Sequence, residues 1–386
     1  MHNYVISDIH GNSERLKVLM RTLKQRHPSG DFMLHIIGDI FDRGKNSAGV
    51  YKILADNYRN INLLLGNHEM LFMDFMEDPE KSFFLWQLNY AYPTIQSFID
   101  EFLPGFLLDE VIFKHRNLIG LYEDTYKQTK TKLARLFGKR EENSVEAYLR
   151  EIKDRNSDRD MRKVSMYVRG YIKKECPHLP QKNRALIENI TYLLLLDKFC
   201  ALYSHFATLK AYDIVDDKYL LVHSGFVTRD YDAKIYDSVK PSFYRIDCKT
   251  KEDLKLQDAY PMLWSRRHNL ATEQRHTPSE KFDGLTIIFG HTIVSNFRKN
   301  NSNSLNPLIT YDANGEIASI GIDGKNYDRE NGQLNCICLD DLSLMMVTGS
   351  NIIHSTNNHS NPLTISKLPP ILNKNHKQHE LPEVGD

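Results

Sequence analysis

The chain has 386 residues, of which 41% are apolar, so it can bury one large core or two ordinary ones. Its 50 Lys and Arg residues balance its 50 Asp and Glu residues, so no overall charge points to a nucleic acid or a membrane surface as a partner. No apolar run is long enough to span a bilayer, and the first residues, MHNYVISDIHG, lack the apolar stretch of a signal peptide. The five cysteines have no paired spacing and indicate reduced thiols. We therefore expect a cytoplasmic protein.

The first hundred residues alternate short apolar runs with segments of helical periodicity. Apolar residues recur at helical spacing in SERLKVLMRTLKQ and SAGVYKILADNY, which separate the runs. This order predicts a βαβαβ unit, and hence a parallel sheet covered by helices. The three predicted strands are NYVIS, FMLHIIG and INLLLG.

From about residue 218 the pattern changes to strands joined mainly by turns. It predicts a second, more antiparallel sheet. The predicted strands are KYLLVHS, LTIIFG, IASIGID, LNCICLD and SLMMVTG.

The stretch 101–215 between these halves is predicted to be a charged helical insert. Residues 114–184 hold 19 Lys and Arg against 10 Asp and Glu, which is typical of a solvated helical face. The last stretch, 351–386, is rich in Asn, His, Pro and Lys and is predicted to be a disordered tail. The domain prediction is therefore a catalytic domain formed by 1–100 and 216–350, with the insert and the tail outside it.

Polar side chains follow five of the predicted strands, at the point where each strand ends. The carboxyl ends of strands in an open α/β sheet form the crevice in which ligands bind, so side chains from several strands can converge there. The motifs are SDIHGN with Asp8 and His10, GDIFDRG with Asp39, Asp42 and Arg43, GNHE with Asn67, His68 and Glu69, VHSGF with His223, and GHT with His291.

These side chains offer carboxylate oxygen, amide oxygen and imidazole nitrogen, without a thiolate. Such a donor set suits Mn²⁺, Fe or Zn²⁺. The donors are too many for one ion, whereas two ions about 3.5–4 Å apart that share one carboxylate would use them all. The candidate metal ligands are Asp8, His10, Asp39, Asn67, His223 and His291.

GDIFDRG together with GNHE resembles the calcineurin-like metallophosphoesterases, and the phosphoprotein phosphatase branch in particular. The resemblance covers about 1–75 and 218–350, and it implies an α/β fold of two stacked mixed β-sheets flanked by helices, an αββα sandwich. The long recognition segments of the eukaryotic phosphatases are not evident, so the chain is most similar to bacterial and phage-like members.

The resemblance implies a role for each metal ligand. Asp8 and His10 would bind the first ion, and Asp39 would bridge both ions. The second ion would be bound by Asn67, His223 and His291. The nucleophile would be a metal-bound hydroxide.

The resemblance also assigns the residues that handle the phosphoryl group. His68 would be the general acid, and Asp42 would hydrogen-bond its imidazole and keep it protonated, since a carboxylate partner raises a histidine pKa. Arg43 would bind phosphoryl oxygens, and Arg266 in LWSRRH would be a second phosphate-binding residue, although the adjacent Arg267 could take that part.

Departures from the family pattern concern the rim of the site. Ser224-Gly225 stands where the family often has two glycines, and IGIDGKNYDRENG replaces a segment rich in glycine and aromatic residues. Glu69 is expected to hold the GNHE turn through backbone hydrogen bonds.

We therefore expect a two-metal phosphomonoesterase, most simply a Ser/Thr phosphoprotein phosphatase with Mn²⁺. One alternative is a dinucleoside-polyphosphate or nucleotide phosphohydrolase with the same site. Another is a binding protein with an inactive site, against which the intact ligand set argues. The expected partner is a phosphorylated protein or a small phosphoester.

Overall fold

The computed structural model describes residues 1–102, 161–175, 177, 181–225, 250–256, 259–264, 280–297, 303–348 and 363–367. Residues 103–160, which make up about half of the predicted insert, lie outside these ranges. Arg266, Arg267 and most of the tail also lie outside them.

Sheet A contains the predicted N-terminal unit. β1 (His2–Ile6), β2 (Phe32–Ile37) and β3 (Ile61–Leu64) are parallel neighbours, and α1 (Ser13–Arg26) and α2 (Ser47–Asp56) connect them. The predicted βαβαβ order is confirmed. The full strand order of sheet A is β11-β10-β9-β1-β2-β3, where β9 is Gln333–Cys338, β10 is Ser343–Thr348 and β11 is Leu363–Lys367.

Sheet B differs from the second sheet that the sequence predicted. The runs that became β9 and β10 pair in sheet A, because β9 is buried on both faces and extends the buried β1 in antiparallel pairing. Three central strands of sheet B are parallel, and only its edges are antiparallel. Its order is β4-β5-β6-β8-β7, with β4 Tyr212–Val215, β5 Tyr219–Val222, β6 Thr286–Phe289, β7 Leu308–Tyr311 and β8 Ile317–Gly321.

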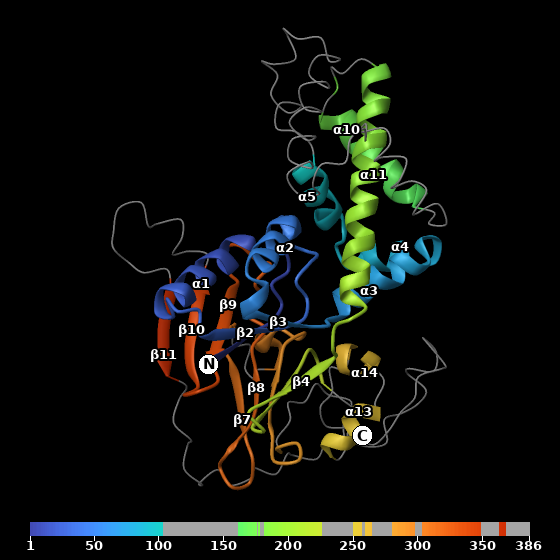
Figure 1. Ribbon diagram of the computed structural model, residues 1–386. Helices are drawn as coiled ribbons and strands as arrows, with labels where there is room; N and C mark the ends of the chain where they lie inside the picture. Colours follow the sequence, from blue (N-terminus) through green and yellow to red (C-terminus); the bar gives the residue numbers. More distant parts are fainter. Residues whose placement is uncertain are drawn as a thin grey trace, which may run out of the picture.

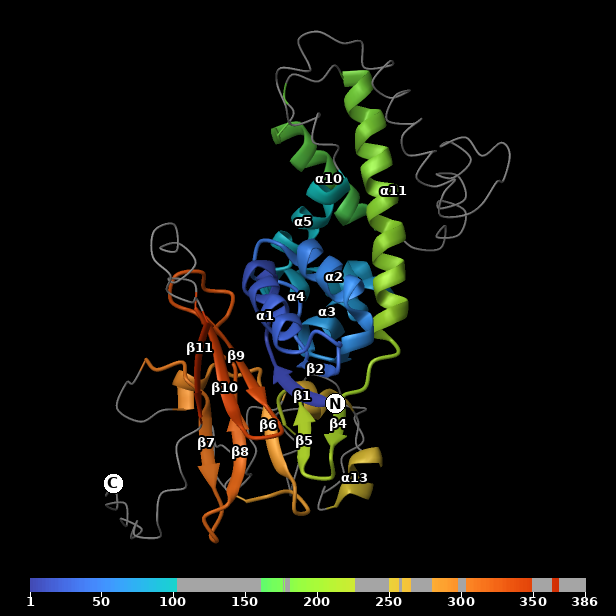
Figure 2. The ribbon, with the colours of Figure 1, turned by 60° about the vertical axis from the view of Figure 1, so that its left-hand side comes forward.

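The helices and sheets form four layers, which Figures 1 and 2 show, and three apolar cores lie between them. Alternate residues of each strand face opposite sides. Tyr4 and Ile6 of β1 therefore join the core under α1 and α2, whereas Val5 joins the core between the sheets. In sheet B, Leu221 faces sheet A, and its neighbours face α13 (Lys251–Leu256) and α14 (Ala259–Trp264). The predicted αββα sandwich is confirmed.

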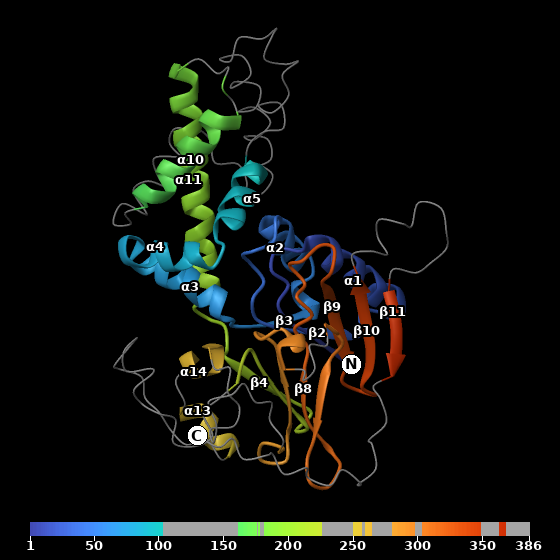
Figure 3. The same cartoon turned by 180° about the vertical axis from the view of Figure 1, so that it is seen from behind.

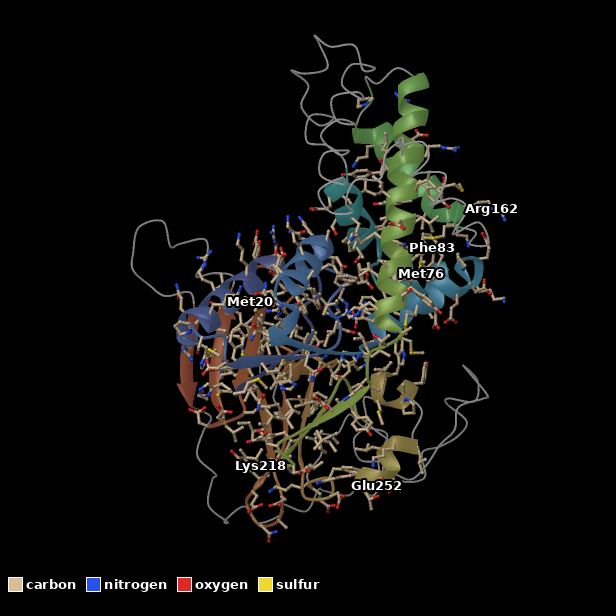
Figure 4. The ribbon with its side chains drawn as sticks, in the orientation of Figure 1. Met20, Met76, Phe83, Arg162, Lys218 and Glu252 are labelled. Atoms are coloured by element: carbon tan, nitrogen blue, oxygen red, sulfur yellow. The ribbon has the colours of Figure 1, made fainter. Side chains whose placement is uncertain are left out.

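A helical lobe rises beside sheet A, and Figure 3 shows it from behind. Met76, Phe83 and Arg162 are labelled in Figure 4 where α3 and α4 meet the lobe. The lobe helices and their neighbours are α3 (Asn67–Glu77), α4 (Pro79–Leu88), α5 (Tyr92–Phe102), α10 (Arg162–Glu175) and α11 (Gln181–Phe206).

The described part of the insert packs one face of its helices into the core. Val164, Val168 and Ile172 of α10 recur at helical spacing and are fully buried in the core that also covers sheet A. Short 3₁₀ turns occupy Tyr58–Asn60 and Val294–Phe297. Among the helices that the structure describes, none combines the length and the apolar character needed to cross a membrane.

The tail differs from its prediction over one segment. Leu363–Lys367 forms β11 and pairs antiparallel with β10. The segment LTISK contains β-branched residues, which favour a strand, and β10 would otherwise be an open edge of sheet A.

Candidate active site

The predicted ligands meet at the carboxyl ends of strands from both sheets. Asp8, Asp39 and Asn67 follow β1, β2 and β3 of sheet A, and His223 and His291 follow β5 and β6 of sheet B. Each of these side chains is buried. Because the parallel strands of both sheets end at this one place, residues separated by more than 200 positions become neighbours.

Asp39 lies at the centre of the site, between two groups of possible ligands. Its Oδ2 atom is 3.6 Å from His10 Nε2 and 3.8 Å from His68 Nε2. Its Oδ1 atom is 3.3 Å from His223 Nε2, and His291 completes that second group within 4.8 Å. This arrangement is the one that a bridging carboxylate requires, while the assignment of each ion's ligands stays a prediction.

In the second group, the amide oxygen of Asn67 lies between two imidazole nitrogens. His223 Nδ1 donates to the carbonyl of Ile37 at 2.8 Å, so the neutral ring presents an unprotonated Nε2. That nitrogen is 2.9 Å from Asn67 Oδ1, which is itself 2.9 Å from His291 Nδ1. A cation would satisfy such a cluster, and a ligand histidine commonly donates its other nitrogen to a carbonyl in this way.

The first group has the same character. His10 Nδ1 donates to the carbonyl of Phe41 at 2.8 Å, so its Nε2 is the acceptor nitrogen, and it lies 3.8 Å from Asp8 Oδ1 and 3.6 Å from Asp39 Oδ2. Asp8 Oδ1 and His68 Nε2 are buried and have no hydrogen-bond partner among the described residues. Buried polar atoms without partners are costly, so the residues present fit two hard or borderline divalent ions.

The backbone of the site is strained at the residues that carry the chemistry. Asp8, His10, Asp39 and His291 have φ values of 48°, 45°, 55° and 61°, in the left-handed region that non-glycine residues avoid. Asp42 and Arg43 share this conformation, at 65° and 64°. Strain concentrated at one place is typical of a functional site, where the surrounding structure enforces it.

Gly66 is required for close approach rather than for its backbone angles. Its φ of −111° is open to any residue, but an added Cβ would lie 2.3 Å from Asp39 N and 2.4 Å from Asp39 Oδ1. Glu69 braces the same turn. Its carboxylate accepts backbone N–H groups from Asp39 at 2.8 Å, Ile40 at 3.0 Å and Gly66 at 3.0 Å, which confirms the expected role.

Asp42 and His68 form the predicted pair. His68 Nδ1 lies 2.8 Å from Asp42 Oδ2, so its Nε2 points into the site. Two residues that sequence reasoning missed hold Asp42. Trp86 Nε1 donates to Oδ2 at 2.9 Å, and Thr94 Oγ1 donates to Oδ1 at 2.7 Å. Both come from helices outside the motifs, and no pattern in the sequence links them to Asp42.

Burial controls the ionisation of these groups. It raises the pKa of Asp8 to about 6 and the pKa values of Asp39 and Asp42 to about 7. It also lowers the pKa of His10 and, with Arg43 nearby, holds the pKa of His68 well below its ordinary value. Burial is the largest cause of this lowering at His68 when no ion is bound, and the role of Asp42 in keeping the imidazole protonated stays a prediction. Bound cations would favour the carboxylate form of the aspartates.

Arg43 lies at the mouth of the site. Its Nη1 donates to His10 Nε2 at 2.9 Å, and its guanidinium lies 5.2 Å from the centre of the Tyr327 ring. Tyr327 belongs to the segment that departs from the family pattern, so this segment builds one wall of the site. Arg266 and Arg267 lie outside the described residues, although the ring of nearby Trp264 is 6.3 Å from that of His291.

Residues 1–170 match the family model of the calcineurin-like phosphoesterases. The matched segment carries Asp8, His10, Asp39 and His68 in the geometry described above, whereas His223 lies beyond it. The match covers less than half of the chain and supports the predicted enzyme class of metallophosphoesterase. No curated protein sequence matches it.

Several solved structures share part of this arrangement at low identity. A protein described as a candidate diadenosine tetraphosphatase is 12% identical, with a TM-score of 0.36 over 90% of this chain and 93% of its own. A cold-active protein-tyrosine phosphatase from a psychrophilic Shewanella species is 14% identical, with a TM-score of 0.38 over 90% and 78%. A protein serine/threonine phosphatase from Saccharomyces cerevisiae is 12% identical, with a TM-score of 0.33 over 97% and 82%. Likeness at this level does not discriminate between substrates.

Proposed function

We propose that this metallophosphoesterase is a Ser/Thr phosphoprotein phosphatase of the bacterial and phage-like type, which hydrolyses phosphomonoesters in one step. One observation carries the proposal. Asp39 lies between two buried groups of metal-ligating atoms, and His68, oriented by Asp42, points its Nε2 to the same place. The motifs GDIFDRG and GNHE support the phosphatase branch.

Two divalent ions bound here would stabilise charge on the phosphoryl group and activate water for attack. Asp8, His10 and Asp39 would hold the first ion, and Asp39 with Asn67, His223 and His291 would hold the second. The remaining steps belong to the chain itself. The Arg43 guanidinium would bind phosphoryl oxygens at the mouth of the site, and His68 Nε2 would deliver a proton to the leaving oxygen.

The donor set favours Mn²⁺, with Fe or Zn²⁺ as alternatives, because oxygen and imidazole donors surround the site. The described cysteines take no part in it: Cys336 and Cys338 lie in β9, and Cys200 lies in α11. The phosphorylated substrate protein and the cytoplasmic location remain proposals that rest on the sequence alone.

The test is a side-by-side assay of the purified protein with Mn²⁺. The substrates are a phosphoserine peptide, a phosphotyrosine peptide and diadenosine tetraphosphate, and released phosphate and nucleotide are measured. We expect the phosphoserine peptide to have the highest kcat/KM. A higher value for diadenosine tetraphosphate would overturn the protein phosphatase assignment and establish a nucleotide phosphohydrolase with the same site.

A further inference from the structure

A strip of large apolar side chains lies exposed beside the site. It consists of Phe84, Leu85 and Leu88 on α4 and Tyr90 in the turn after it, which are 69%, 48%, 60% and 66% exposed. Scattered apolar residues are common on surfaces, but adjacent ones at helical spacing form a continuous patch, and such patches mark interaction sites. Tyr92 is excluded from the strip because its ring stacks on Tyr167, at a centroid distance of 4.8 Å.

The opposite face of α4 is fixed to the catalytic residues. Trp86 is fully buried, stacks on Phe75 and donates to Asp42. The last turns of α4, residues 83–88, carry apolar side chains on both faces, with Gln87 as the one polar residue among them. Here the inner face supports Asp42 while the outer face remains in solvent, so the core does not account for the outer residues.

The strip leads directly into the cleft that contains the site. A cavity of about 420 Å³ is lined by Arg43 and His291 at its catalytic side and by Leu88 and Tyr90 at its outer side. The two sides are tied together, because the Arg43 backbone N–H donates to the Tyr90 carbonyl at 3.1 Å. The strip is therefore held at a fixed distance from the place where a phosphoryl group would bind.

The charge of this cleft selects among occupants. Over the described part of its lining, Arg43 and His291 are the charged or ionisable side chains, and Ile293 and Tyr327 extend the uncharged wall. An acidic residue next to the phosphorylated side chain would compete with the phosphoryl group for Arg43, and a basic one would find no carboxylate on the described wall. An apolar residue would bury surface against Leu88, Tyr90 and Ile293.

We propose that the strip formed by Phe84, Leu85, Leu88 and Tyr90 binds an apolar side chain that flanks the phosphorylated Ser or Thr of a protein substrate. The proposal rests on the proposed function, since it names the substrates that this phosphatase prefers. The strip is continuous with the cleft, so a chain whose phosphate lies near Arg43 and His291 leaves the site across Leu88 and Tyr90.

The test compares phosphoserine peptides that differ only in the flanking residues, which are Leu, Ser or Glu. For the wild type we expect kcat/KM to be about tenfold higher with Leu than with Ser or Glu, which is about half or more of what full burial of one leucine supplies. The variant F84S/L88S should reduce this preference to about twofold or less, through KM rather than kcat. Both side chains are more than half exposed, so we expect the variant to fold, and its thermal melting curve checks this.

The matched control is Leu256→Ser, because Leu256 is 68% exposed on α13, away from the cleft. It should keep the full preference for Leu. Three results would overturn the proposal: a wild type that hydrolyses all peptides equally, an F84S/L88S variant that keeps the preference, or a variant that loses only a self-association seen by sedimentation.

The outcome also separates this inference from the proposed function. If p-nitrophenyl phosphate is hydrolysed and no phosphopeptide is, the phosphoprotein assignment fails and the strip falls with it. If phosphopeptides are hydrolysed without regard to their flanks, the assignment survives and only the strip is wrong. If F84S/L88S weakens diadenosine tetraphosphate hydrolysis instead, the strip binds a nucleobase, which overturns the peptide proposal.

Discussion

The half of the site carried by sheet A differs from the half carried by sheet B in the groups that brace it. In the sheet A half, the buried Glu69 carboxylate accepts three backbone N–H groups, and Asp42 is held by Trp86 and Thr94. In the sheet B half, His223 is held by a carbonyl of sheet A. The turn after it is held by the neutral Ser224 hydroxyl and by the backbone N–H groups of Ser224 and Gly225, which all donate to the Met262 carbonyl.

The sheet B half therefore depends on sheet A for its position. The backbone N–H of His291 donates to Asp8 Oδ2 at 3.0 Å, and both histidines of this half contact Asn67. The sheet A half is therefore the more heavily braced of the two, and the sheet B half is positioned by its hydrogen bonds to it. Four substitutions would break or sharpen this distinction.

The largest effect is expected for Asp39→Asn, which alters the residue shared by both halves. Removing the central carboxylate charge should abolish binding of both ions and reduce phosphomonoester hydrolysis by about a thousandfold or more, since metal ions supply several kcal/mol of transition-state stabilisation. Elemental analysis and p-nitrophenyl phosphate turnover measure the two losses. Unchanged occupancy by two ions would show that Asp39 does not bridge them.

The next effect is expected for His68→Asn, which changes a residue of the sheet A half but leaves every predicted metal ligand in place. Both ions should remain, and turnover of a phosphoserine peptide should fall by about 10²–10⁴, the usual contribution of a general acid. The loss should be smaller for p-nitrophenyl phosphate, whose leaving group needs no proton. Loss of an ion would make His68 a ligand, as its 3.8 Å distance from Asp39 permits.

Glu69→Gln tests the brace of the sheet A half. Glutamine keeps the shape but presents an NH₂ group to backbone donors, so we expect the free energy of unfolding to fall by about 1–3 kcal/mol. Urea titration followed by circular dichroism measures this change. Glu330→Gln, at an exposed position, is the matched control and should stay within about 0.5 kcal/mol of the wild type. Equal urea midpoints for Glu69→Gln and Glu330→Gln would show that Glu69 does not brace the sheet A half.

Ser224→Ala tests the brace of the sheet B half and should have the smallest effect. The Ser224 hydroxyl donates to the Met262 carbonyl at 2.8 Å, but that carbonyl also accepts the Ser224 backbone N–H at 2.9 Å and keeps a partner. We expect a loss of about 0.5–1.5 kcal/mol in the same urea titration. A cost larger than that of Glu69→Gln would reverse the contrast between the two halves.

The sequence predicts the parts of this molecule that depend on local patterns. Strand ends that carry Asp8, Asp39 and Asn67 are visible as apolar runs followed by polar motifs, and the βαβαβ order follows from their periodicity. The convergence of His223 and His291 on the same point was expected from the resemblance, and the structure brings them there.

Other features depend on pairing between distant segments, which local patterns do not encode. β9 and β10 were predicted for a second sheet, yet β9 pairs with β1. The support of Asp42 by Trp86 was likewise invisible, because it follows from how α4 packs on α3 and not from spacing. The low pKa of His68 is a property of burial, which the neighbouring carboxylate alone does not reveal.

The position of β1 has a consequence for synthesis of the protein. Its neighbours in sheet A are β2, which is made soon after it, and β9, in which Ile337 and Cys338 pair with Val5 and Tyr4. At 5–20 residues per second, the ribosome needs about 15–65 s to reach β9 after completing β1. During that interval one edge of β1 lacks its partner, and an unpaired apolar strand invites association with other chains. We therefore expect nascent chains of this protein to need chaperone protection until the last strands of sheet A emerge.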